Sequence, residues 1–170
     1  MSTRDVVSSY ARTLATSRMI ASETRSSART RLVWFVAIAG FALLNGPTIW
    51  SAIGGRTFAG TDYVLLALPW AMAALLALVT HFFIDEAGVK DDVVSVQKLA
   101  MVDLHLEAIK EGDDDALEIL QIINDTHPDL KNSKVVADRY GSWAKWLERI
   151  TFSLLVLGFI WSLAVPLLIP

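Results

Sequence analysis

The chain has 170 residues, of which 54% are hydrophobic and only 19% charged, with a formal net charge of −3 and no cysteine. Soluble domains are typically about 25% charged. All 15 Lys and Arg and all 18 Asp and Glu residues fall outside three long uncharged stretches, residues 32–55, 63–84 and 150–170. This distribution excludes a soluble globular enzyme, and the lack of cysteine excludes a disulfide framework and a thiolate metal site.

The first segment, residues 1–31, carries six arginines against two acidic residues. Four of the arginines fall within about 60° of one another on a helical wheel: Arg4, Arg18, Arg25 and Arg29. One interpretation is an amphipathic helix on the anionic inner leaflet of a membrane, where each basic side chain contributes about 1 kcal/mol. The alternative is a flexible, solvated arm, because the segment is also rich in Ser and Thr. Both interpretations remain open.

The three uncharged stretches are long enough to span a bilayer. As helices they measure about 31 to 36 Å, against a hydrocarbon core of about 30 Å. Arginines cluster before the first stretch, and the loop at 56–62 is neutral. The positive-inside rule therefore predicts a cytoplasmic N-terminus, an external loop, cytoplasmic residues 85–149 and an external C-terminus. We expect an integral membrane protein, most simply of a bacterial inner membrane.

The spans contain small residues at the spacing typical of helix packing. They are Ala42 and Gly46 in the first span, Ala67, Ala71 and Ala74 in the second, and Gly158 and Ser162 in the third. Asn45 is the one strongly polar uncharged residue well inside a span, and its amide could form a hydrogen bond between helices. This packing is expected within one subunit slightly more than between subunits.

Residues 85–149 form an acidic helical module, with fifteen Asp or Glu against eight Lys or Arg. A first helix is expected from about Asp92 to Glu111. The run Asp113, Asp114 and Asp115 is expected to cap a short helix, which Asn124 and Pro128 end. After a polar turn at 131–133, one long helix should run from about Lys134 to the end of the chain, with Gly141 as its weak point.

Motifs for catalysis or metal binding are missing from the sequence. The Asp113–Asp115 run lacks the alternating oxygen ligands of a calcium loop. The three histidines, His81, His105 and His127, share no helical metal spacing. No phosphate loop, nucleophile elbow or zincin pattern is present. We therefore expect no enzyme, no cofactor, no metal and no nucleic-acid partner.

The sequence predicts an all-α membrane protein with three transmembrane helices and a small cytoplasmic helical module between the second and third. In this order of segments the chain resembles several small bacterial membrane effectors. One functional hypothesis is a homo-oligomeric effector or pore, in which the module senses a ligand or partner and acts on the third span through the long helix. The alternative is a non-catalytic adaptor or accessory subunit, whose acidic module docks a basic soluble protein.

Overall fold

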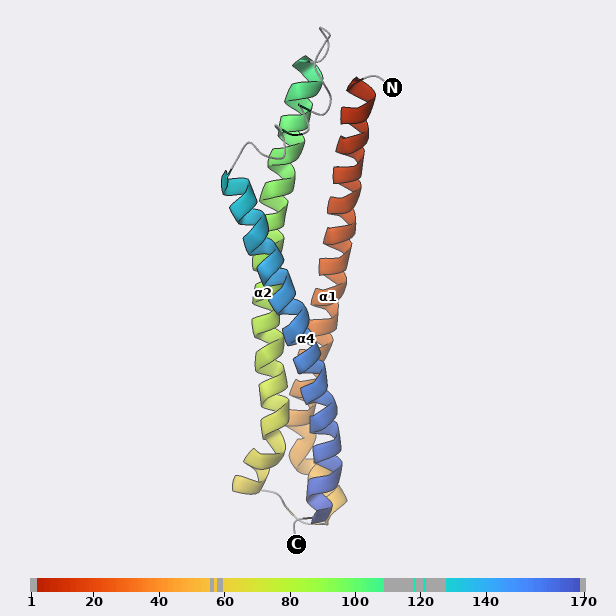
Figure 1. Cartoon of the computed structure of the whole chain (residues 1–170). Helices are drawn as coiled ribbons and strands as arrows, with labels where there is room; N and C mark the ends of the chain where they lie inside the picture. The colour runs from red at the N-terminus through yellow and green to blue at the C-terminus, as the bar shows by residue number, and fades with distance from the viewer. Residues whose placement is uncertain are drawn as a thin grey trace. The chain divides into compact units, whose positions relative to one another are not determined.

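The computed structural model of the chain is all-α in the part that it describes, which is residues 3–55, 57, 60–108, 118, 121 and 128–168. Three long helices make up this part: α1 (Thr3–Gly54), α2 (Thr61–Ala108) and α4 (Pro128–Leu168) (Figure 1). Each is long and apolar enough to cross a membrane by length and composition. The expected all-α class and the three apolar helices of spanning length are therefore present.

The chain divides into two compact units, and all three helices contribute residues to both. Unit 1 comprises Met1–Ser27 and Asp85–Gly141, and unit 2 comprises Ala28–Ile84 and Ser142–Pro170. All three expected spans lie wholly in unit 2: 32–55, 63–84 and 150–170. Most of the charged residues belong to unit 1 or lie at its borders.

Helix α1 begins at Thr3, so the arginine-rich segment is helical and continuous with the first span. Ser and Thr usually disfavour helix interiors because their side chains compete for backbone groups. Here the hydroxyls are compatible with the helix, because they donate to carbonyls three or four residues back. Examples are Thr13 to Ser9 at 3.0 Å and Thr24 to Ile20 at 2.9 Å.

The turn after α1 uses glycine where the backbone is left-handed. Gly55 has a φ of 67° and donates its N–H to the carbonyl of Ser51 at 2.9 Å, which closes the helix. Gly60, with a φ of 59°, precedes the start of α2 at Thr61. Both conformations are costly for residues with a side chain.

The structure corrects two predicted helix boundaries. The helix expected to start near Asp92 has no start of its own, because α2 runs through residues 84–92 unbroken. Gly88 fits this helix because its missing side chain leaves room for Arg25, whose Cδ would lie 3.2 Å from a Cβ at that position.

The long helix expected to start at about Lys134 begins earlier, at Pro128. The end of the short helix expected at Asn124 and Pro128 lies outside the described residues. Proline suits the first turn of a helix, where its missing N–H has no partner to lose. The predicted turn at 131–133 is therefore helical as well. The expected long helix through Gly141 is present, and the division between the two units falls directly after this glycine.

Many buried side chains of α2 and α4 recur three or four residues apart, the spacing that places them on one face of a helix. Unit 1 has a small core of Val7 and Val102, flanked by Tyr10, Ala11, Met101 and Leu106. In unit 2 the larger core comprises two clusters. Their fully buried members include Leu32, Ala39, Leu66, Ala73 and Ala77.

Candidate functional site

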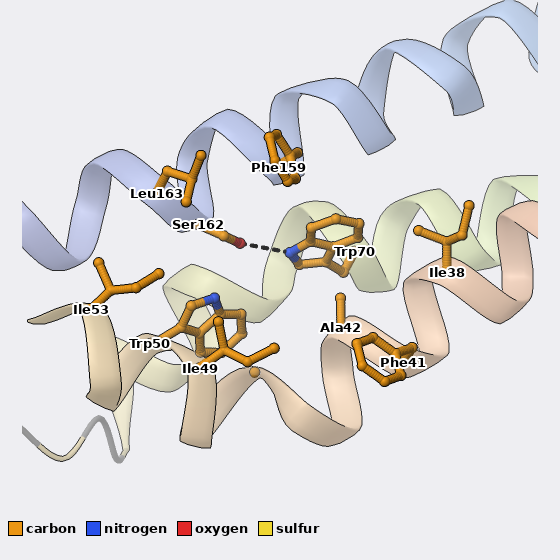
Figure 2. Close-up of a pocket in the computed structure, with 11 residues that line it drawn as sticks. Ile38, Phe41, Ala42, Ile49, Trp50, Ile53, Trp70, Phe159, Ser162 and Leu163 are labelled. Atoms are coloured by element: carbon orange, nitrogen blue, oxygen red, sulfur yellow. Dashed lines mark hydrogen bonds between the residues drawn. The ribbon is translucent and has the colours of Figure 1, made fainter.

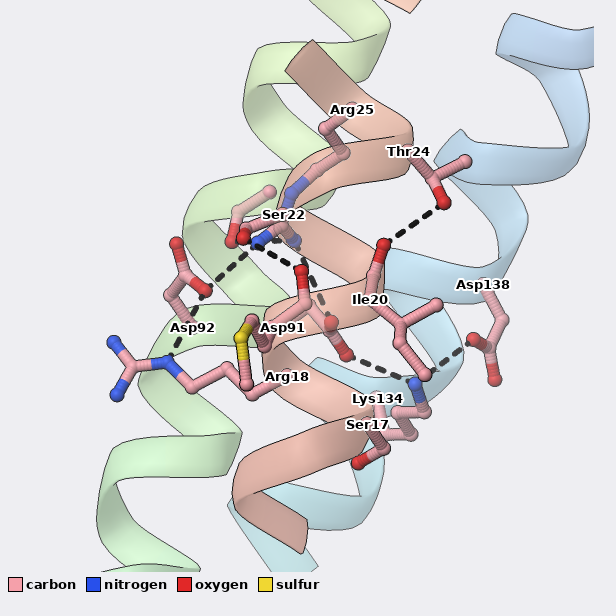
Figure 3. A network of polar contacts seen from close by, with 12 residues as sticks. Ser17, Arg18, Ile20, Ser22, Thr24, Arg25, Asp91, Asp92, Lys134 and Asp138 are labelled. Carbon is pink, nitrogen blue, oxygen red and sulfur yellow. Dashed lines mark hydrogen bonds and ion pairs between the residues drawn. The ribbon is translucent and has the colours of Figure 1, made fainter. Parts of the chain in front are cut away.

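The described part of unit 1 has a network of charged side chains drawn from all three helices. Arg25 of α1 donates through Nη2 to Oδ1 of Asp92 at 2.9 Å and through Nη1 to Oδ2 of Asp91 at 3.4 Å. Lys134 of α4 donates to Oδ1 of Asp91 at 2.9 Å. Asp91 therefore lies between a guanidinium and an ammonium group (Figure 3).

Two further ion pairs extend this network. Arg18 lies 3.7 Å from Asp92, and Lys134 lies 3.3 Å from Asp138 in its own helix. The central side chains are largely shielded, with Arg25 17% and Asp91 22% exposed, whereas Lys134 is 51% exposed. The hydrogen bond to Asp91 raises the pKa of Lys134, against the opposing effect of burial. Lys134 is therefore fully charged at neutral pH.

The four arginines predicted for the membrane surface divide between two environments. Arg18 and Arg25 belong to the ion-pair network, whereas Arg4 and Arg29 are exposed on α1. Sequence reasoning missed the partners of Arg18 and Arg25 because Asp91 and Asp92 are more than sixty residues away. The signal available was the adjacent Asp91-Asp92 pair on a helix whose other face is apolar.

In unit 2 the small residues of the sequence analysis occupy mostly inward positions. Gly46, Ala67, Gly158 and Ser162 are buried, and Ala42 and Ala74 are half-buried. The two glycines among them lie against the indole rings of tryptophan side chains. A Cβ at Gly46 would lie 2.5 Å from Cη2 of Trp50, and a Cβ at Gly158 would lie 3.1 Å from Cε2 of Trp70. The glycines therefore make room for tryptophan.

Ala71 and Asn45 differ from the other predicted packing residues, because both are exposed on the surface of the chain. The amide of Asn45 donates to the carbonyl of Phe41 at 3.1 Å within its own helix. The amide oxygen of Asn45 accepts no hydrogen bond from any residue that the structure describes. A polar amide on the outer surface of a spanning segment is suited to a hydrogen bond with another chain.

An apolar hollow of about 240 Å³ lies beside Gly46 in unit 2. Trp50, Trp70 and Phe159 are among the residues that line it, and Trp70 Nε1 donates to Ser162 Oγ at 2.9 Å at its wall (Figure 2). This hydrogen bond satisfies both buried polar groups. None of the side chains that line the hollow is charged.

Two prolines in the spans leave backbone carbonyls without their helical donors, and aromatic side chains supply the missing bonds. Pro69 cannot donate to the carbonyl of Leu65, and Trp161 Nε1 donates to that carbonyl at 3.1 Å. Pro47 cannot donate to Leu43, whose carbonyl accepts from the hydroxyl of Tyr63 at 3.3 Å. Each of these carbonyls thereby accepts a hydrogen bond from a side chain of another helix.

Few contacts are described for the remaining residues that the sequence singled out. Asp113, Asp114 and Asp115 lie outside the described residues. His105 Nδ1 lies 2.8 Å from the carbonyl of Met101, one turn earlier in α2. Among the described residues, no three His, Asp or Glu side chains converge to hold a metal ion.

Comparisons of the chain with protein-family models, with curated proteins and with solved structures find no match. The class that the fold defines is an all-α protein with three helices of membrane-spanning length and composition.

Proposed function

We propose that the chain is a homo-oligomeric membrane effector, or the subunit of a pore, whose acidic module senses a ligand or docks a partner on the cytoplasmic side. One observation carries the proposal. Helix α4 holds Lys134 in the ion-pair network of unit 1, and the same helix packs Gly158 and Ser162 against Trp70 in unit 2. A change at the network therefore acts on the helix that forms the third span.

Self-association is supported by the outer surface of the spanning segments. Asn45 places an amide on that surface, and its strongest use in a bilayer is a hydrogen bond to another chain. The exposed side chains around it are large and apolar, including Phe41, Leu44 and Ile49. Lipid or a second copy of the protein can cover these apolar side chains. In the bilayer core, however, only another protein chain offers a hydrogen-bond donor or acceptor to the Asn45 amide.

Conduction, if the oligomer is a pore, requires a path between copies. The outer surface of the spanning segments is largely apolar, so a gate between copies would close by dewetting, and charge selection would come from the mouths. The acidic module carries a net charge of −7 in each copy, which concentrates cations. Exposed Arg4 and Arg29 oppose this field unless anionic headgroups neutralise them.

The experiment that tests the proposal is the mass of the particle in nanodiscs, followed by current recording in planar bilayers under a salt gradient. A symmetric oligomer of this chain alone, with a reversal potential on the cation side, is expected. Changing Asp113, Asp114 and Asp115 to Asn should move that potential toward zero. A complex that contains other proteins, with no conductance, would instead identify an adaptor that docks a basic partner.

A further inference from the structure

Outside one face of α2, the exposed large apolar side chains in the described part of unit 1 are Met19, Ile20, Leu104 and Val135. That face of α2 is apolar over several turns. It consists of Val89, Val93, Val96 and Ala100 on α2, spaced four, three and four residues apart. The three valines are 58%, 46% and 48% exposed, and Ala100 is exposed as well. We call these four residues the valine face. It lies on the green part of α2 in Figure 1.

The neighbouring helices show what a solvent-facing surface in this unit looks like. The outward side of α1 carries Ser and Thr hydroxyls bonded to their own helix, interrupted by Met19 and Ile20. The outward side of α4 carries the charged residues Lys131, Asp138 and Arg139, with a single exposed valine, Val135, among them. A row of exposed valines along several turns is atypical of a surface in water and indicates a contact with another apolar surface.

The spacing of the valine face is that of a coiled-coil seam, and it assigns positions to the charged residues beside it. Glu86, Val93 and Ala100 take the a positions, and Val89 and Val96 take the d positions. Asp85 then falls at g and Lys90 at e. In two parallel helices in register, a g residue faces the e residue five positions later in the other helix. Asp85 therefore faces the partner's Lys90, and the pair occurs twice.

Charge complementarity thus selects a second copy of this chain as the occupant. Lys90 is available for this pair, because its contact with Glu86 of its own helix is long, at 3.9 Å, and its side chain is 41% exposed. Two copies of Glu86 would also face each other at the seam. This like-charge contact opposes association, and the neighbouring lysines offset it in part.

We propose that α2 pairs with α2 of a second copy through the valine face, as a parallel, in-register seam flanked by Asp85 and the partner's Lys90. The proposal rests on the homo-oligomer proposed above and adds its interface within unit 1. In the sequence, the same alternation of three and four continues back through Phe82, Val79 and Leu75, all exposed. From Leu75 to Ala100 it thus repeats over nearly four heptads, interrupted by Glu86, which is a length typical of a coiled-coil seam.

Disulfide trapping tests the seam directly, because the chain has no cysteine of its own. Val96→Cys at a d position is compared with Thr13→Cys, which is exposed on α1 of the same unit. Both full-length variants are oxidised in nanodiscs after the particle mass has been measured. Val96→Cys should form dimers roughly tenfold faster or more, because the seam holds the two sulfurs at a high effective concentration.

The outcomes separate the two proposals. An oligomeric particle in which both cysteines react at the same rate overturns the seam and leaves the homo-oligomer standing. A particle of a single chain overturns both. Rapid trapping of Val96→Cys in an oligomer, together with slow trapping of Thr13→Cys, supports both.

Charge exchange then tests the register, with the cross-linking rate of Val96→Cys as the readout. Lys90→Asp should slow trapping by roughly threefold or more, since it sets two like charges opposite each other. Adding Asp85→Lys should restore the rate. Glu86→Gln should speed trapping, a gain that misfolding cannot produce. Failure of the double variant to recover, or slower trapping in Glu86→Gln, would reject the parallel in-register pairing.

Discussion

Gly46 is the position in the first span where one methyl group has the largest effect. Its Cβ would overlap the ring of Trp50, which is 2% exposed and has no free volume to move into. We expect Gly46→Ala to lower the free energy of unfolding by about 1 to 3 kcal/mol, the usual cost of overpacking. Thermal unfolding in detergent, followed by circular dichroism, measures the change.

Gly40 provides the matched control in the same helix. A Cβ at Gly40 has nothing within 4 Å, so Gly40→Ala should leave stability unchanged or raise it slightly. Equal losses in the two variants would show that Trp50 does not lie against Gly46.

Arg25 should contribute more to stability than any exposed arginine of α1. It donates to Asp91, to Asp92 and, at 3.5 Å, to the carbonyl of Gly88, and its side chain is 17% exposed. Arg25→Met leaves two carboxylates without this donor and should cost about 1 to 3 kcal/mol. Arg12→Met, at an exposed position, should cost little.

The planar guanidinium of Arg25, with two NH2 groups that reach different carboxylates, should contribute to stability beyond its charge. Arg25→Lys should recover only part of the loss, because an ammonium group cannot contact both carboxylates in the same way. Unfolding in mixed micelles of increasing SDS fraction compares the three variants. A full recovery with lysine would mean that charge alone holds the network.

At the scale of the element, the prolines of α1 and α2 predict a coupled pair of substitutions. Trp161→Phe removes the donor to the carbonyl of Leu65 and should cost roughly 1 kcal/mol in a bilayer or micelle. In the background of Pro69→Ala the same change should cost much less, because the alanine N–H now supplies the helical hydrogen bond. A double-mutant cycle on unfolding free energies measures the coupling.

Tyr63→Phe with Pro47→Ala offers a second cycle of the same kind. Additive losses in both cycles would show that the aromatic donors do not serve the freed carbonyls.

How far the sequence predicts these elements depends on whether the signal is local. The absence of charge over twenty or more residues is a local signal, and it correctly indicates three long apolar helices. Pro128 is compatible both with the end of a helix and with its first turn, so its neighbours alone do not decide between them. The partners of Arg25, Tyr63 and Trp161 depend on how three helices meet, and no short window of sequence contains that information.

At the scale of the whole molecule, the arginine imbalance predicts the orientation of the chain in the membrane. A reporter fused after Pro170 should be active only on the external side, and one inserted after Gly112 only in the cytoplasm. We expect the six arginines of residues 1–31 to determine this orientation, so replacing most of them with Gln should produce mixed orientations. An external reporter at Gly112 in the native chain would place the acidic module outside the cell.

The hydroxyls along the first half of α1 have a consequence for the medium in which that surface can reside. Ser8, Thr13, Thr16, Ser17, Ser22 and Thr24 each donate their proton to a carbonyl of the same helix. Such a hydroxyl loses little free energy when it leaves water, because it keeps its hydrogen bond to the helix backbone. The free energy of these hydroxyls therefore depends little on the polarity of the medium around this surface. We expect this surface to exchange bulk water for the headgroup layer at small cost, with the exposed Arg4 and Arg29 favouring anionic headgroups.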